Sequence, residues 1–330
     1  METKIMTRNN ESFSCDRRSF FRAATAAAIG ATVGAGFNAS TQAQDAPAKS
    51  GARRGNLISA SSYCYWHFDQ DVSAPMDQCL RKTAELGFDA FEVLEQQLDR
   101  TDTAYYHELR REAFLCGIPL CCMSTHQTFV RPSADERKRN VEKTKRSIDV
   151  ANEMGIPTLR VNTGRWDSWG SFDALMEHRG IEKPLEGYTD DDAFGWCIAA
   201  FEELVPYAES RGVMLCLENH WGMARTAAGM IRILDAVDSP WLGCMVDTGN
   251  FLDDTMEQIE ALMPRANFVQ AKTYFGGGVW YELPLDYVEI GELFRKYNYR
   301  GYVSLEFEGR EDPDTAVPKS LALLRENLYF

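Results

Sequence analysis

Eight short apolar runs within residues 57–309, separated by longer amphipathic stretches, constrain this chain more than any other feature of its sequence. The stretches between them carry apolar residues at helical spacing, and several end in Gly, as in 76–87, 136–155 and 193–212. Apolar strands that alternate with helices are typical of a parallel sheet with both faces covered. The runs are 57–66, 90–96, 119–126, 158–164, 213–220, 242–250, 267–274 and 302–309.

Eight strand–helix units in about 275 residues predict a single-domain (β/α)8 barrel, a TIM barrel, rather than an open doubly wound sheet. The first run is also not followed by a Gly-rich dinucleotide fingerprint. Such barrels keep their active sites at the C-terminal ends of the strands, where the long insert 166–192 follows the fourth run. We interpret this insert either as a wall of the substrate cavity or as a plain surface loop.

The first 43 residues have the pattern of a twin-arginine export signal. Arg17 and Arg18 directly precede Ser-Phe-Phe, and an uncharged Ala/Gly-rich stretch follows. Small residues up to Ala43 suit a signal peptidase, and cleavage after Ala48 is an alternative. The apolar stretch is short and weakly hydrophobic for a membrane span, so we expect no stable membrane insertion. The mature protein is expected to be periplasmic or secreted by the twin-arginine route.

Three further segments complete the expected organisation. A polar linker spans 44–56, the barrel spans 57–325, and a tail spans 326–330. The tail reads ENLYF, which resembles the start of a protease-site tag and could equally be native. The cysteines beyond the signal lie mostly in apolar or helical stretches, where buried free thiols are the usual outcome.

The charge balance argues against nucleic acid as a partner. The chain has 35 Lys and Arg against 49 Asp and Glu, whereas binding to a phosphate backbone depends on Lys and Arg. The oligomeric state stays open, and a homo-oligomer is compatible with this composition.

Acidic residues end three of the eight apolar runs. Glu218, Asp247 and Glu306 belong to the fifth, sixth and eighth runs, and the seventh contributes Gln270 and Lys272. In a barrel these strand ends point toward one mouth. Converging carboxylates repel one another unless a cation lies among them, so the pattern predicts a bound divalent metal ion.

The segments LENH, VDTGN, VQAK and SLEFEG, in this order, resemble the sugar phosphate isomerase/epimerase superfamily, the xylose isomerase-like TIM barrels. The resemblance implies that one divalent metal ion is held by Glu218, Asp247, Gln270 and Glu306. Gln270 replaces the usual His, and Asn250 stands where many members have a His. Because the resulting ligands are all oxygen atoms, Mn or Mg is expected rather than Zn.

The resemblance also implies a reaction. The metal ion would chelate a ketone oxygen and its neighbouring hydroxyl, and so stabilise the enediolate formed on deprotonation. Glu218 and Glu306 would transfer the proton, and Lys272 would bind the oxyanion. This chemistry implies an isomerase or epimerase that acts on a small carbohydrate, cyclitol or related hydroxy-ketone.

Three alternatives stay open at this point. The same deprotonation followed by loss of a leaving group would make the protein a dehydratase or a 3-keto-glycoside lyase. The departure at Gln270 would also suit a non-catalytic carbohydrate-binding barrel without a metal ion. A zinc nuclease resembling endonuclease IV is disfavoured, because the chain has five His in total.

Six further residues are expected at the mouth of the barrel, where they would bind substrate. Four are polar residues of the apolar runs or their ends, and two are aromatic residues that could face a sugar ring. They are His126, Asn162, His220, Glu92, Trp66 and Trp221.

Overall fold

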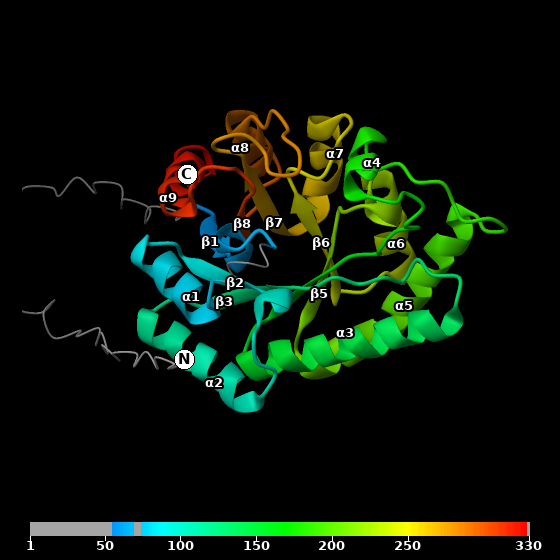
Figure 1. The fold of residues 1–330 in the computed structure, drawn as a ribbon, viewed down its shortest axis with the longest axis horizontal. Helices are drawn as coiled ribbons and strands as arrows, with labels where there is room; N and C mark the ends of the chain where they lie inside the picture. The colour runs from blue at the N-terminus through cyan, green and yellow to red at the C-terminus, as the bar shows by residue number, and fades with distance from the viewer. Residues whose placement is uncertain (1–54, 69–73, 329–330) are drawn as a thin grey trace, which may run out of the picture. The chain divides into compact units, whose positions relative to one another are not determined.

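The computed structural model, which describes residues 55–68 and 74–328, confirms the predicted barrel. Eight parallel strands pair in chain order, and β8 closes the barrel against β1 (Figure 1). Each strand coincides with one of the eight apolar runs. The strands are β1 Leu57–Ser61, β2 Ala90–Leu94, β3 Leu120–Ser124, β4 Thr158–Val161, β5 Met214–Glu218, β6 Leu242–Asp247, β7 Ala266–Thr273 and β8 Tyr302–Phe307.

Helices surround the barrel and connect consecutive strands (Figure 1). The α-helices are α1 Met76–Glu85, α2 Thr103–Cys116, α3 Ala134–Met154, α4 Phe172–Glu177, α5 Asp190–Arg211, α6 Ala227–Val237, α7 Thr255–Leu262, α8 Tyr287–Lys296 and α9 Pro313–Leu328. Short 3-10 helices are η2 Ser62–Tyr65, η3 Glu95–Gln97, η4 Gly222–Ala224 and η5 Met263–Arg265.

Local sequence signals explain where several of these helices begin and end. Gly117, Gly155 and Gly212 follow α2, α3 and α5 with φ values of 72°, 71° and 66°, a left-handed conformation that Gly adopts without strain. At the start of α5, the Thr189 side chain accepts from the backbone of Asp192, and the Asp192 side chain accepts from the backbone of Thr189.

Strand alternation determines which side chains enter the barrel. Phe268, Gln270 and Lys272 are two residues apart on β7 and therefore share a face, as do Cys216 and Glu218 on β5. An apolar cluster at the N-terminal ends of the strands includes Cys216 and Phe268. Polar and charged side chains follow it toward the C-terminal ends, so the strands themselves concentrate charge at one mouth.

The structure describes only part of the segments predicted on either side of the barrel. The predicted export signal and nearly all of the predicted linker lie outside the described residues. Helix α9 continues to Leu328, so the first residues of the expected 326–330 tail form its last turn. All eight cysteines of the described residues are free thiols, as expected. Within 55–68 and 74–328, no helix is long and apolar enough to cross a membrane.

Candidate active site

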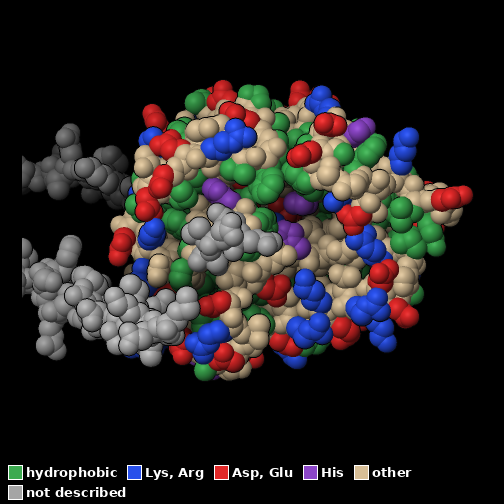
Figure 2. Space-filling model, in the orientation of Figure 1, with side chains coloured by type: hydrophobic (Ala, Val, Ile, Leu, Met, Phe, Trp, Pro, Cys, Tyr) green, Lys and Arg blue, Asp and Glu red, His purple; other side chains and the backbone are tan. Residues whose placement is uncertain are grey.

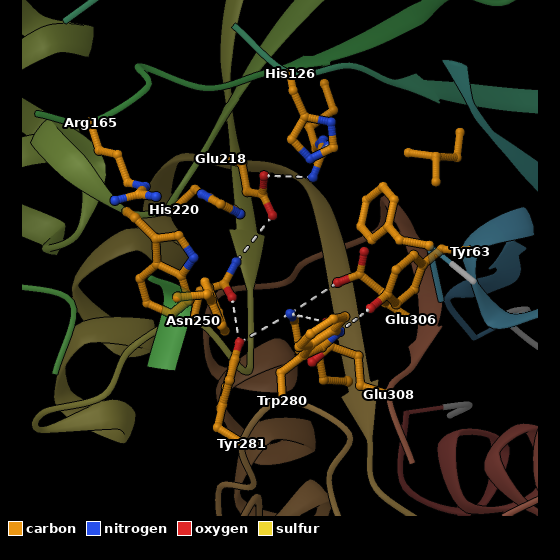
Figure 3. Close-up of a pocket in the computed structure, with 16 residues that line it drawn as sticks. Tyr63, His126, Arg165, Glu218, His220, Asn250, Trp280, Tyr281, Glu306 and Glu308 are labelled. Atoms are coloured by element: carbon orange, nitrogen blue, oxygen red, sulfur yellow. Dashed lines mark hydrogen bonds and ion pairs between the residues drawn. The ribbon is translucent and has the colours of Figure 1, made fainter. Parts of the chain in front are cut away.

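A cavity of about 340 Å³ lies at the C-terminal ends of the strands (Figure 3). His side chains lie near the centre of the molecular face shown in Figure 2, bordered by hydrophobic side chains. Charged groups from β4, β5, β7 and β8 form the floor, and aromatic residues form much of the wall. The lining residues are Tyr63, Phe68, Leu94, His126, Arg160, Arg165, Phe172, Glu218, His220, Trp221, Asn250, Lys272, Trp280, Tyr281, Glu306 and Glu308.

Glu218, the last residue of β5, is buried, and both of its carboxylate oxygens accept hydrogen bonds. Arg160 of β4 donates to Oε2 at 2.9 Å, and the Asn250 amide donates to Oε1 at 3.1 Å (Figure 3). Burial raises the pKa of Glu218 to about 7, although the Arg160 charge acts in the opposite direction. A carboxyl group with this pKa both gains and loses a proton readily near neutral pH.

Lys272 of β7 places a single ammonium group among three carboxylates. Its Nζ lies 2.8 Å from Glu308 Oε1, 3.2 Å from Glu306 Oε2 and 3.7 Å from Asp247 Oδ2. Burial by itself lowers the pKa of Lys272, but the negative charges of Asp247, Glu308 and Glu306 raise it well above its ordinary value. Lys272 therefore stays protonated in the barrel interior.

A directional series of hydrogen bonds connects Lys272 to Glu218. Lys272 Nζ donates to the Tyr281 hydroxyl at 3.1 Å, and this hydroxyl donates to Asn250 Oδ1 at 2.8 Å. The Asn250 amide nitrogen in turn donates to Glu218 (Figure 3). Asn250 therefore orients the proposed base and is itself oriented by Tyr281.

Two partly buried His residues line the cavity. Burial lowers the pKa of both His126 and His220 well below the ordinary value, and the charge of Arg160 lowers it further. Arg160 Nη2 lies 3.2 Å from His126 Nε2, and a guanidinium can only donate. His126 is therefore neutral and carries its proton on Nδ1.

Aromatic residues form the rim of the cavity. Phe172 of the long insert contacts the rings of Trp221 and Trp280, with centroids 6.3 Å and 5.8 Å away. Trp280 Nε1 donates to the Tyr63 hydroxyl at 3.0 Å, which joins the loop after β7 to η2. The insert thus contributes to the cavity wall, in agreement with one of its two interpretations.

Six of the predicted site residues line the cavity, and five do not. Those that line it are Glu218, Lys272, Glu306, His126, His220 and Trp221. Asp247 lies just behind Lys272 and has an Oδ1 that accepts from the backbone of Gly249. Trp66 packs against the ring of Phe68, which lines the cavity in its place.

Glu92 and Asn162, which were expected to bind substrate, do not line the cavity. Glu92 lies deeper in the barrel, where Oε1 accepts from Ser124 and from the Gln270 amide. Asn162 accepts a hydrogen bond from the backbone of Gln127 and thereby joins two loops. The sequence places Glu92 within the second run and Asn162 near the end of the fourth, but it does not give the depth that determines which inward side chain reaches the mouth.

The predicted metal ligands do not form a site that fits a divalent ion. Gln270 is directed at Glu92, with 2.7 Å between the amide nitrogen and the carboxylate, and it does not line the cavity. Lys272 lies among the carboxylates where an ion would need to be. Within 55–68 and 74–328, no group of three or more His, Cys, Asp or Glu residues could hold a metal ion.

Sequence reasoning missed several residues of this site, above all Arg160 and Glu308. Alternation contained the signal for both: Arg160 shares a face with Asn162, and Glu308 shares one with Glu306. Tyr281 and Trp280 come from the loop after β7, which no periodic pattern places.

Comparison with known proteins agrees with the fold. Residues 80–327 match the family model described as xylose isomerase-like TIM barrel. No curated protein matches the sequence. Among solved structures, D-psicose 3-epimerase with D-tagatose from Clostridium cellulolyticum H10 has a TM-score of 0.66 and 18% identity, covering 82% of this chain and 99% of that one.

Two other solved structures are also similar to this chain. The apo form of 3-keto-D-glucoside 4-epimerase from E. coli has a TM-score of 0.65 and 19% identity, covering 82% of this chain and 99% of that one. L-ribulose 3-epimerase has a TM-score of 0.60 and 18% identity, and the match covers 81% of this chain and 86% of that one. At these identities the likeness establishes a common fold.

Proposed function

The chain belongs to the xylose isomerase-like TIM barrel family, and we propose that it is an isomerase or epimerase of a sugar, cyclitol or related hydroxy-ketone. The observation that carries this proposal is the pairing, in one cavity, of a carboxyl group whose pKa is about 7 with a protonated lysine. The similar solved structures include epimerases of psicose, ribulose and a 3-keto-glucoside, which supports a carbohydrate substrate.

In the proposed reaction, Glu218 removes the proton from the carbon beside a carbonyl group. The C–H electron pair forms the carbon–carbon double bond of an enediolate, and the carbonyl electron pair moves to oxygen. Lys272 donates an N–H to this oxyanion. In an epimerase, Glu306, which enters this step carrying a proton taken from solvent, gives it to the opposite face of the same carbon, and the oxyanion electron pair re-forms the carbonyl group. Glu218 then returns its proton to solvent. In an isomerase the proton goes to the neighbouring carbon, and the hydroxyl there passes its own proton to the oxyanion as its oxygen becomes the new carbonyl.

The remaining cavity residues suit the binding of a sugar. Phe172, Trp221 and Trp280 present apolar rings to the C–H faces of a sugar, and His126 and His220 are uncharged hydrogen-bonding groups. A carbohydrate requires this mixture of apolar walls and a few polar groups.

Deuterium exchange tests the proposal whichever product the reaction gives. The protein is incubated in D2O with keto-sugars, inososes and oxidised glycosides, and NMR detects deuterium beside the carbonyl carbon. Incorporation is expected with wild type and with Glu203→Gln, an exposed control, but not with Glu218→Gln. A dehydrated or cleaved product would indicate the lyase alternative. Binding without exchange would indicate a non-catalytic carbohydrate-binding barrel.

We also propose that the protein is exported by the twin-arginine route to the periplasm or beyond. Arg17, Arg18 and the Ala/Gly-rich stretch that follows them support this proposal.

A further inference from the structure

The centre of the cavity floor is taken by the ammonium group of a lysine. Lys272 Nζ donates to Glu308, to the Tyr281 hydroxyl and toward Glu306, so all three of its N–H groups have acceptors. Asp247 Oδ2 is 3.7 Å from the same nitrogen. A divalent ion bound by Asp247 and Glu306 would lie beside this ammonium and would be repelled by it.

Arg160, the second cation of the cavity floor, hydrogen-bonds Glu218, which is another of the predicted metal ligands. Arg160 is 3% exposed, and its guanidinium donates to Glu218 at 2.9 Å and to the Thr125 carbonyl at 3.1 Å. The remaining oxygen of Glu218 accepts from Asn250. Both oxygens of Glu218 are therefore satisfied by side chains rather than left as donors for an ion.

Gln270, the fourth predicted metal ligand, makes its hydrogen bond away from the cavity. The Gln270 amide donates to Glu92, one layer below the cavity. An imidazole from β7 would be the strongest donor for a transition metal, and this strand supplies an amide directed away from the cavity instead. His126 does not compensate, because its Nε2 accepts a hydrogen bond from Arg160.

From these contacts we infer that the protein works without a divalent metal ion, because Lys272 and Arg160 supply within the chain the positive charge that the carboxylates require. These two cations, on β4 and β7, place positive charge permanently among the carboxylates of the floor. Lys272 is the cation that meets the substrate, and Arg160 is a positioning residue that acts through Glu218.

The role of Lys272 in catalysis rests on the proposed function, whereas the absence of a metal requirement rests on the contacts alone. A substrate oxygen that accepts an N–H of Lys272 would displace Glu306 or Tyr281 from it. Displacement of Glu306 would free this carboxylate to take up a proton from solvent and to deliver it to the substrate carbon. The ammonium would then stabilise the enediolate oxyanion through a charge-assisted hydrogen bond.

Metal analysis of the wild-type protein is the first test. Protein purified without added metal or chelator should contain far less than one Mn, Mg, Zn or Co per chain by mass spectrometry. Its melting temperature should be unchanged by EDTA and by excess MnCl2. Stoichiometric metal, or a melting temperature that EDTA lowers, would overturn the inference.

Lys272→Gln provides the second test, because it removes the ammonium and leaves Asp247, Glu306 and Glu308 without their cation. The melting temperature of this variant should rise with MnCl2 concentration. The reason is that an ion bound by the freed carboxylates of the folded state stabilises that state. Lys145→Gln is the matched control, because Lys145 also lies between two glutamates but at the surface. A folded Lys272→Gln variant that responds to MnCl2 no more than this control would contradict the inference.

The two proposals fail in different ways. Deuterium exchange that persists in EDTA supports both, and exchange that requires added metal overturns the metal-free inference while leaving the isomerase intact. If no substrate exchanges under either condition, the proposed function fails, and the metal content of the wild-type protein still decides the inference. That measurement also decides it if Lys272→Gln does not fold.

Discussion

Replacement of Arg160 by Met tests the charge balance of the cavity most directly. The buried guanidinium hydrogen-bonds Glu218 at 2.9 Å, the Thr125 carbonyl at 3.1 Å and His126 at 3.2 Å. Met retains much of the side-chain volume but cannot donate a hydrogen bond or carry a charge. Glu218 would therefore remain buried without the cation that hydrogen-bonds it.

The expected loss of stability has two parts. The carbonyl of Thr125 loses its buried donor, which costs about 1–3 kcal/mol at any pH. The second part depends on pH, because the loss of Arg160 raises the pKa of Glu218 above its wild-type value of about 7. Below pH 7 both proteins hold a proton on Glu218, so this part is small.

Above pH 7 the two proteins differ in proton content. Wild-type Glu218 releases its proton, whereas folded Arg160→Met still holds one that the unfolded chain has lost. A raised folded-state pKa gives stability that is lost as pH rises, so the variant should lose a further ~1.4 kcal/mol per pH unit relative to wild type. This slope continues until the variant's own Glu218 ionises.

Urea unfolding at several pH values between about 6 and about 9 measures this difference in the free energy of unfolding. Arg160→Met/Glu218→Gln should lose the pH-dependent part and keep the constant part, since the amide cannot ionise. Arg211→Met, at an exposed ion pair with Asp149, is the control and should show little change at any pH. A deficit that stays constant with pH, or that survives in the double variant, would refute the reasoning.

Three other changes have definite expected results. Glu306→Gln should lower turnover by about 10²–10⁴-fold in the deuterium-exchange assay while the circular dichroism spectrum stays unchanged; turnover near wild type would remove Glu306 from the mechanism, and a loss of folding would make it structural. Changing Arg17 and Arg18 together to Lys should leave precursor in the cytoplasm in a fractionation assay, whereas unchanged export would indicate another route. Gln270→His should not create Mg or Zn binding in a metal titration, because Gln270 faces Glu92; Zn binding by this variant would restore Gln270 as a ligand position.

The barrel could be predicted because its signal is repeated along the chain. Each strand is an apolar run with helical patterns on either side, and Gly residues such as Gly155 and Gly212 mark helix ends. An error at one strand would not have changed the fold predicted from the other seven. The predicted runs extend past the observed strands because the polar residues at their ends, such as Asn162 and His220, belong to loops over the mouth.

The site could be predicted only in part, because strand position fixes the direction of a side chain but not its depth. Glu92 and Glu218 both point into the barrel, yet Glu218 lines the cavity and Glu92 lies below it. Depth depends on the stagger between strands: Gln270 lies opposite Asp247 in the β6–β7 register, whereas Lys272 lies opposite Glu306 in the β7–β8 register. Nothing in one sequence supplies that stagger.

The carboxylates predict a cation among them, and the sequence analysis assigns that role to a bound metal ion rather than to a side chain of the protein. Gln270 and Lys272 are two residues apart on one strand, so any argument that turns Gln270 inward also turns Lys272 inward. A lysine that enters a barrel near three carboxylates keeps its charge, since its burial is balanced by their attraction. The same alternation of side chains turns Arg160 of β4 into the barrel, where it pairs with Glu218 of β5. Once both cations are counted, the acidic floor no longer requires a metal ion, and the departure at Gln270 becomes part of the same charge balance rather than a defect in it.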